Sequence, residues 1–451
     1  MTTPPPATPT AVPKAFSVTH RGVLAIAVPM TLAYLSTPLL GVVDTAVIGR
    51  LGDAALVGGI ALGGVIFDVV FTTFNFLRSG TTGLTAQALG AHNQSEMRAT
   101  LLRALIIAVG AGVAVIALQQ PLKSAGLYFL GGSTAVQDAT ALYFDVRVYS
   151  APFLLANYVI LGWFIGLGRA GTGLALQFLL NGLNILLSIW FVVGLGWGVA
   201  GVAGATVISE AVTIIAGGIL VLRTARGGGW PATAQVFEKR LLLRMLALNR
   251  DIMIRSFTLL FAFAFFAARS ADQGDVILAA NAILEKLVIL AAYFLDGLAT
   301  AAEQLAGRAV GARHRPAFDR AVRLTALWSF AVAAVLSLVL VSLGGVLLDL
   351  MTVSEDVRLV GRDYLFWAAA APLFGVLAYQ MDGVFIGATW SKDMRNMMLL
   401  SLAVFLAAYY ALFPSMGNHG LWFALVLFLG IRGISLALIC PKRAAVTFQS
   451  A

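Results

Sequence analysis

Residues 23–49 read VLAIAVPMTLAYLSTPLLGVVDTAVIG and contain one charged side chain, Asp44. About 20 predominantly apolar residues in a helix cross the hydrocarbon core of a bilayer, so this stretch can span a membrane. Eleven other stretches have the same character. The sequence therefore predicts twelve spans, at 23–49, 55–80, 99–119, 139–167, 174–195, 198–222, 252–270, 276–306, 322–345, 358–388, 396–416 and 420–440.

The composition of the whole chain supports this interpretation. Of its 451 residues, 60% are hydrophobic and only 11% are charged, with a mean hydropathy of +0.90, which is far outside the range of soluble domains. The alternating ten-residue segments of a membrane β-barrel do not occur, so helices must satisfy the backbone hydrogen bonds within the bilayer. We expect an all-α integral membrane protein.

The ends of the chain and its single cysteine exclude several other features. Residues 1–20 begin with MTTPPPATPTAVPK and lack the basic start and short apolar core of a signal peptide, so we expect a disordered tail. One cysteine, Cys440, cannot form an internal disulfide, and no ligand spacing for a metal is present. We expect no metal and no cofactor.

The formal net charge of +9 is explained by membrane orientation. With the N-terminus in the cytoplasm, 21 of the 30 Lys and Arg residues fall on the cytoplasmic side and five on the opposite side, which is the asymmetry that the positive-inside rule requires. Anionic lipid then accounts for the basic balance, and a nucleic-acid partner is not needed. We expect a monomer in the inner (plasma) membrane, with both termini cytoplasmic.

An internal repeat appears when the chain is shifted by 221 residues. The shift places GWFIG at 162–166 on GVFIG at 383–387, and LGAH at 89–92 on VGAR at 310–313. Each half holds six spans, an even number, so the two halves enter the membrane from the same side and form a parallel repeat. Two similar six-helix lobes that face each other are expected.

The repeat also sets the domain boundaries. We predict a tail (1–20), a first lobe (21–222), a cytoplasmic linker (223–250), a second lobe (251–441) and a C-terminal tail (442–451). Within the linker, FEKRLLLRMLALNR is predicted to form an amphipathic surface helix. Its apolar side would carry Leu241, Met245 and Leu248.

The repeat offset shows that Asp44 belongs to a polar group found in only one lobe. It pairs Asp44 with Phe265, Asn184 with Phe405 and Ser188 with Tyr409. An ionisable side chain inside a membrane span is a functional candidate by default. Burial favours the neutral form of a carboxyl group, so its charge can depend on the proton concentration of the side that it faces. The alternative is a hydrogen-bonded acid that only joins helices. Pro29 interrupts the backbone ladder of the same span and would permit a bend.

The second lobe contains further intramembrane acids. Glu285, Asp296 and Glu303 share one helix face with Thr300, and Asp382 lies on the tenth span. These acids could form an ion or substrate site, or a structural ion-pair network in which Lys286 and Arg432 are the neutralising partners. Glu210 on the sixth span is similarly ambiguous. Four charged residues nearer span ends are interpreted as mainly structural: Asp68, Arg78, Asp145 and Arg147.

Several large side chains could form an adaptable apolar wall for a substrate. These are Met30, Tyr34, Phe265 and Tyr293. The alternative is that they only pack the spans.

The sequence resembles the multidrug and toxic compound extrusion (MATE) family, in its DinF-like branch, over almost the whole chain after residue 20. The resemblance is carried, in order, by VDTAVIGRLG, NYVILGWFIGLGRA, LNILLSIWFVVGLGWGVAGVAGATVISE, AANAIL, YFLDGLATAAEQLAGRAVGA and MDGVFIGATWSKDMRN. It implies a two-lobed, twelve-helix antiporter that exports organic, often cationic or amphipathic, compounds in exchange for protons or sodium.

The resemblance also implies roles for individual residues. The family's cation-coupling Asp of the first span, beside a bend-forming Pro, matches Asp44 and Pro29. Its supporting polar residues match Tyr143, Asn184 and Thr206. Ser188 departs from the pattern, because many relatives carry a second Asp there. Sodium needs several oxygen ligands and compensating charge, whereas a proton needs one carboxyl group, so this departure favours protons.

Other functions remain as alternatives. The same fold could use sodium, or export a metabolite such as an organic acid or a lipid-linked compound. A membrane enzyme would need a nucleophile with a base, or a metal cluster, but the four histidines fall in tails or loops without ligand spacing (His20, His92, His314 and His419). No phosphate-binding GxxxxGK loop occurs, so ATP drive is not expected. A channel would need only a continuous pore.

Overall fold

The computed structural model describes residues 16–226 and 229–449, and within these ranges the chain forms helices and no strand. Twelve helical segments are long and apolar enough to cross a membrane. This confirms the predicted all-α fold with twelve spans. The predicted disordered tail lies mostly outside the described residues, since the description begins at Phe16.

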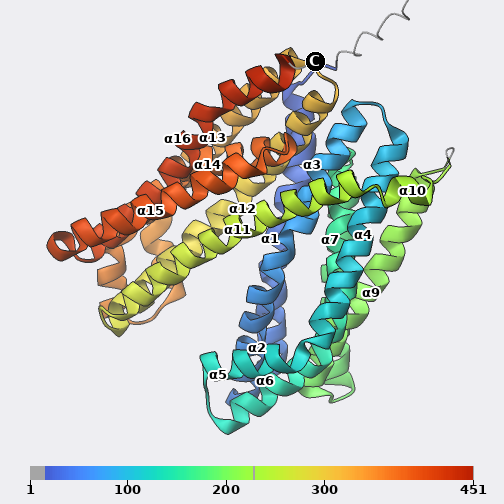
Figure 1. Ribbon diagram of the computed structural model, residues 1–451. Helices are drawn as coiled ribbons and strands as arrows, with labels where there is room; N and C mark the ends of the chain where they lie inside the picture. Colours follow the sequence, from blue (N-terminus) through green and yellow to red (C-terminus); the bar gives the residue numbers. More distant parts are fainter. Residues whose placement is uncertain (1–15, 227–228, 450–451) are drawn as a thin grey trace, which may run out of the picture.

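The spans follow the chain in two groups of six (Figure 1). The first group is α1 (His20–Gly49), α2 (Ala54–Thr72) with α3 (Phe76–Gly90), α4 (Gln94–Ala117), α6 (Thr134–Arg147) with α7 (Ala151–Gly166), α8 (Ala170–Ile189) and α9 (Gly198–Thr224). The second group is α11 (Lys239–Ala271), α12 (Asp275–Gly311), α13 (Arg315–Met351), α14 (Glu355–Gly387), α15 (Ser391–Met416) and α16 (Asn418–Gln449).

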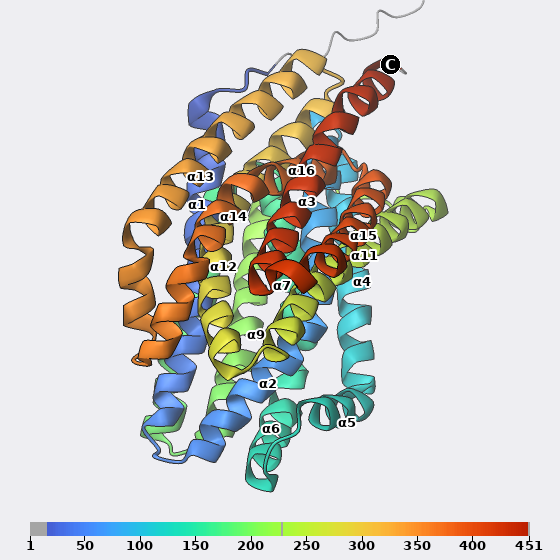
Figure 2. The same cartoon turned by 90° about the vertical axis from the view of Figure 1, so that its left-hand side faces the viewer.

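One helix was not expected from the sequence. The short helix α5 (Gln119–Leu130) lies crosswise between the ends of α4 and α6 (Figure 2). Tyr128 and Phe129 near its C-terminus are 83% and 82% exposed. Aromatic side chains of this kind are enriched where a protein meets the membrane–water interface, so α5 has the character of an interfacial helix.

The linker differs from the prediction in one respect. The segment predicted as a separate surface helix continues without a break into the seventh span, as the first turns of α11. Its apolar side is nevertheless the predicted one, because Met245 and Leu248 are buried. The linker also contains the short helix α10 (Thr233–Val236), while residues 227–228 lie outside the described residues. At the C-terminus α16 continues to Gln449, so most of the predicted tail is helical.

The repeat predicted from the sequence recurs in the backbone. A shift of 221 residues carries 54–90 onto 275–311 and 134–166 onto 355–387, the bounds of matching spans. The turns match as well: His92 and Arg313 have φ values of 53° and 52°, and Gly168 and Thr389 have 74° and 58°. A positive φ is uncommon in residues other than glycine, so its recurrence at the same offset is specific.

The repeated GxxxG motifs are sites of close helix packing. A Cβ atom at Gly162 would collide with the carbonyl oxygen of Arg78, and one at Gly383 would collide with that of Ala299. Small residues let the backbones of membrane helices approach closely. Because 78 and 299 are also related by the offset of 221, the same helix pair is built in the same way in both lobes.

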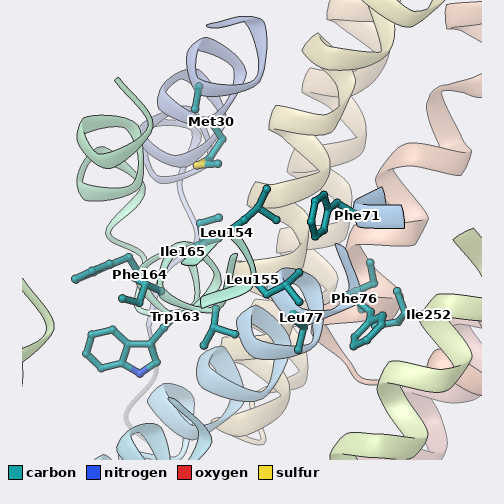
Figure 3. Close-up of a cluster of buried hydrophobic side chains, with 14 of the residues drawn as sticks. Met30, Phe71, Phe76, Leu77, Leu154, Leu155, Trp163, Phe164, Ile165 and Ile252 are labelled. Carbon is teal, nitrogen blue, oxygen red and sulfur yellow. The ribbon is translucent and has the colours of Figure 1, made fainter. Parts of the chain in front are cut away.

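The lobes meet at one end of the molecule and diverge at the other (Figure 1). We call the end where α1 begins and α16 ends the terminal end, and the end that carries α5 the divergent end. At the terminal end, Gly83, Gly90 and Gly311 lie where a Cβ atom would collide with backbone of the opposite lobe. Figure 3 shows how the apolar core of the first lobe continues past Phe76 of α3 to Ile252 of α11.

Candidate functional site

Asp44 lies beside a group of polar residues of α8 and α9. The hydroxyl of Ser188 donates to Asp44 Oδ1 at 3.1 Å and lies 3.4 Å from Asn184 Oδ1. The amide of Asn184 donates to Thr206 Oγ1 at 3.0 Å. All four side chains are buried. The structure therefore brings together four of the five residues predicted for cation coupling.

The local sequence explains this arrangement. Asn184 and Ser188 are four residues apart, so they share one face of α8, which packs against α1. Directly after them the helix widens into a π-helical turn at Trp190–Gly194. Turns of this kind occur frequently at functional sites. Within the described part of the chain Asp44 has no ion-pair partner, so its hydrogen bond to Ser188 is its only recorded polar contact.

Tyr143, the fifth predicted residue, does not bond to Asp44. Its hydroxyl instead accepts a hydrogen bond from Arg147. The Arg147 guanidinium lies over the ring of Phe67, 4.7 Å from its centroid, and within electrostatic range of Asp44 and Asp68. The interpretation of Arg147 as a span-end structural charge was therefore too narrow. The i, i+4 spacing of Tyr143 and Arg147 was the sequence signal that could have linked them.

At the equivalent place in the second lobe an aromatic cluster replaces the polar group. The ring centroid of Phe265 lies 5.6 Å from that of Phe405 and 5.0 Å from that of Tyr409, both in edge-to-face geometry. These are the repeat counterparts of Asp44, Asn184 and Ser188. The same three helix positions therefore meet in both lobes, with opposite polarity.

Helix α1 is not interrupted at Pro29, where the sequence permits a bend. Helix α1 continues through Pro29 and Pro38 from His20 to Gly49. The role of Pro29 in a change of helix shape stays a prediction.

A second polar group lies between the lobes. Arg78 of α3 pairs with Glu303 of α12 at 3.8 Å, and the hydroxyls of Tyr34 and Thr300 lie 2.9 Å apart. Thr300 also donates to the backbone carbonyl of Asp296 at 2.8 Å. Arg78 was predicted to be mainly structural, and its ionic partner belongs to the opposite lobe.

Asp382 is neutralised within the second lobe by two arginines. Arg432 lies 3.1 Å from its Oδ2, and Arg255 of α11 contacts the same oxygen. Arg432 was predicted as a partner, whereas Arg255 was missed. Lys286, the other predicted partner, is exposed on α12 beside Glu285 and takes no part in this cluster. For Asp382, the structural ion-pair alternative is the one that the contacts favour.

The residues predicted to form a substrate wall occupy different environments. Met30 is fully buried in the core of the first lobe (Figure 3), so in this conformation it packs helices. Phe265 belongs to the aromatic cluster, and Tyr34 bonds across the lobes. Tyr293 is partly exposed. The four do not form one continuous wall.

No group of three or more His, Cys, Asp or Glu side chains that could hold a metal ion occurs among residues 16–226 and 229–449.

Comparison with known proteins identifies the family. The sequence profile of the MatE family matches residues 29–190 and 252–410, one block in each lobe. The chain belongs to the MatE family. It is 40% identical over 418 residues to DNA damage-inducible protein F of Escherichia coli (strain K12), which covers 92% of this chain and 90% of that protein. This relative supports the DinF-like resemblance.

Two other comparisons concern a further relative and the fold. It is 25% identical over 448 residues to the chloroplastic Protein DETOXIFICATION 44 of Arabidopsis thaliana, covering 91% of this chain and 80% of that protein. Its fold matches a solved outward-facing conformation of a multidrug resistance MATE family transporter with a TM-score of 0.86 at 18% identity, covering 95% of this chain and 97% of the other. The chain is a multi-pass MATE transporter with two six-helix lobes.

Proposed function

We propose that this MATE protein is a secondary antiporter that exports small organic compounds, often cationic or amphipathic, in exchange for protons coupled through Asp44. It resides in the inner membrane as a monomer, with the terminal end in the cytoplasm. The excess of Lys and Arg in the loops of the terminal end supports this orientation.

The observation that carries the proposal is the environment of Asp44. Its carboxylate is buried, accepts one hydrogen bond from Ser188 and has no cationic side chain at ion-pair distance among the described residues. Arg147 acts on this carboxylate electrostatically but bonds to Tyr143 instead, and a buried charge without a paired partner is costly. The site therefore favours a state in which Asp44 holds a proton or faces a compensating cation.

The exchange follows from these two states of Asp44. From the divergent end Asp44 takes up a proton and loses its charge, α1 repacks near Pro29, and the bound compound leaves. After the lobes rock, the proton leaves to the terminal side and a new compound enters. Asn184 and Thr206 hold Ser188 in place, so its hydroxyl is positioned to stabilise the ionised form of Asp44.

The same environment supports protons over sodium. A sodium ion needs several oxygen ligands and compensating negative charge. The polar group around Asp44 provides one carboxylate. By the family resemblance, Ser188 lies where many relatives have a second acid. One carboxyl group is sufficient to carry a proton.

Transport in proteoliposomes tests the proposal. With an imposed pH gradient, the wild-type protein should move a fluorescent organic cation against its gradient, and Asp44→Asn should abolish that movement. Asp138→Asn, which changes an exposed acid of the same lobe, is the matched control. An Asp44→Asn variant that exchanges cations for protons at the wild-type rate would exclude this role. Wild-type transport that requires a sodium gradient would identify sodium as the coupling ion.

A second candidate cargo is an organic acid, and the surroundings of Asp382 favour it. Arg255 and Arg432 both pair with the one carboxylate of Asp382, so the cluster holds one more positive than negative charge at ion-pair distance. Competition of radiolabelled dicarboxylates against the organic cation in the same vesicles separates the two cargoes.

A further inference from the structure

The ion pair between Arg78 and Glu303 lies where the two lobes meet. Towards the terminal end from this pair the lobes are packed closely, since Gly83 and Gly90 of α3 touch backbone of the second lobe. Gln87, on the same helix, donates hydrogen bonds to Gly387 O at 2.9 Å and to Thr389 Oγ1 at 3.2 Å. The pair is therefore one charged element of the contact that must separate before the terminal end can open; Arg244 of α11, which donates to Gln87 Oε1 at 3.2 Å, is another.

The two partners differ in their access to solvent. The Glu303 side chain is 3% exposed, whereas that of Arg78 is 14% exposed and also donates to Ser79 and Asn75. Glu303 Oε1 and Arg78 Nη1 have no hydrogen-bond partner among the described residues. If the lobes separated with both charges present, the attraction between the Glu303 carboxylate and the Arg78 guanidinium would be lost. A proton on Glu303 removes that penalty.

The pair has no counterpart across the internal repeat. The offset of 221 relates Arg78 to Ala299 and Thr82 to Glu303, so the mirrored contact would join an alanine to a threonine. General packing of α3 against α12 does not need the charges, because the mirrored positions do without them. This asymmetry indicates that the charges serve a purpose other than the fold.

We propose that Arg78 and Glu303 form a latch that holds the terminal end closed and that a proton taken up by Glu303 releases it. The inference rests on the proposed exchange, to which it adds a second proton site, one that controls lobe separation. The other ionisable groups around the pair are Tyr34 of α1, Tyr158 of α7 and Asp296 of α12. The Asp296 carboxylate interacts electrostatically with the Arg78 guanidinium and can attract it once Glu303 is neutral.

Distances between spin labels test the latch without substrate or gradient. In a Cys440→Ala background, one pair of cysteines replaces Gln94 and Arg315 at the terminal end, and another replaces Asp138 and Leu359 at the divergent end. All four residues are exposed, and each pair is related by the repeat. In Glu303→Gln, which mimics the protonated acid, the population with a longer 94–315 distance should rise by about five-fold or more. In the same variant, the 138–359 distance should become shorter as the 94–315 distance becomes longer.

Two further variants make the result specific. The charge swap Arg78→Glu with Glu303→Arg should restore the parent distances. Glu96→Gln breaks an ion pair of the same composition, with Arg103 at 2.6 Å, but within one lobe, and should leave both distances unchanged. Lowering the pH should shift the parent protein towards the Glu303→Gln distances, and should shift Glu303→Gln itself less, because only Asp44 is left to respond there.

Three outcomes would overturn the latch: parent distances in Glu303→Gln, an equal shift in Glu96→Gln, or a charge swap that stays released. Asp44→Asn protein can be labelled in the same way. If Asp44→Asn transports normally while Glu303→Gln shifts the distances, the proposed coupling residue is wrong and the latch is right.

Discussion

Ser188 donates a hydrogen bond to Asp44 at the position where, in the second lobe, Tyr409 packs edge-to-face against Phe265. The same contact between two helices is thus a buried polar site in one lobe and an apolar cluster in the other. Because the backbones match, the difference between the lobes lies in the side chains, and the following predictions test their separate roles.

Adding an acid beside Asp44 should change the preferred ion. In Ser188→Asp two carboxylates face each other, and together with Asn184 they offer the oxygen ligands and charge that sodium requires. We expect transport in proteoliposomes to rise with the external sodium concentration at fixed pH. Ser188→Asn, which is similar in size but uncharged, should not respond to sodium. A Ser188→Asp protein indifferent to sodium would contradict the charge argument.

The aromatic cluster of the second lobe should contribute stability rather than ion coupling. Phe405 is fully buried, so Phe405→Ala should lower the free energy of unfolding by about 3–5 kcal/mol through lost burial and cavity formation. Where folded protein is recovered, it should still couple transport to the pH gradient. Thermal unfolding followed by tryptophan fluorescence measures the first effect, and the vesicle assay measures the second. Loss of proton coupling at full thermal stability would assign this cluster a role in exchange.

The ion-pair cluster around Asp382 should be strongly sensitive to removal of its carboxylate. Asp382→Asn leaves the Arg255 and Arg432 charges buried without a partner, which should cost about 3–5 kcal/mol. Asp393→Asn is the matched control, because it breaks a more exposed pair with Arg443 and should cost only about 0–1 kcal/mol. Thermal stability of the two purified variants gives the comparison. Equal melting temperatures would show that the Asp382 cluster is not structural.

Close packing at the repeated glycines should be detectable by small substitutions. Gly383→Ala introduces a Cβ atom that collides with the Ala299 carbonyl oxygen, and overpacking of this kind costs about 1–3 kcal/mol. Gly64→Ala, where no atom lies within 4 Å of the added Cβ, should be neutral or mildly stabilising because alanine favours helix. The difference in melting temperature between the two variants measures the contact.

The sequence was sufficient for the fold because the bilayer imposes simple constraints. Each span had to be a long apolar helix, and the offset of 221 residues related the two halves. The sequence did not predict helix α5. Its twelve residues are too few to span a membrane, and they mix polar with aromatic side chains. The sequence also treated FEKRLLLRMLALNR as a separate element, since its charges end the apolar run although its helix does not end.

The candidate site was predictable only in part. Asp44, Asn184, Ser188 and Thr206 could be grouped because the family resemblance and helix spacing point to one cluster. Arg78 and Glu303 could not be paired, because a contact between lobes depends on how two rigid bundles meet, and no local spacing reports it. Arg255 was missed because its partner Asp382, although in the same lobe, is 127 residues away in the sequence.

The matching left-handed turns of the two halves have a consequence for how such proteins diversify. His92 and Arg313 share their backbone angle although one carries an imidazole and the other a guanidinium group. The two halves therefore share the backbone of this turn while its side chains differ. A redesigned transporter that grafts new ligand groups should leave these joints untouched and vary the interior of one half at a time.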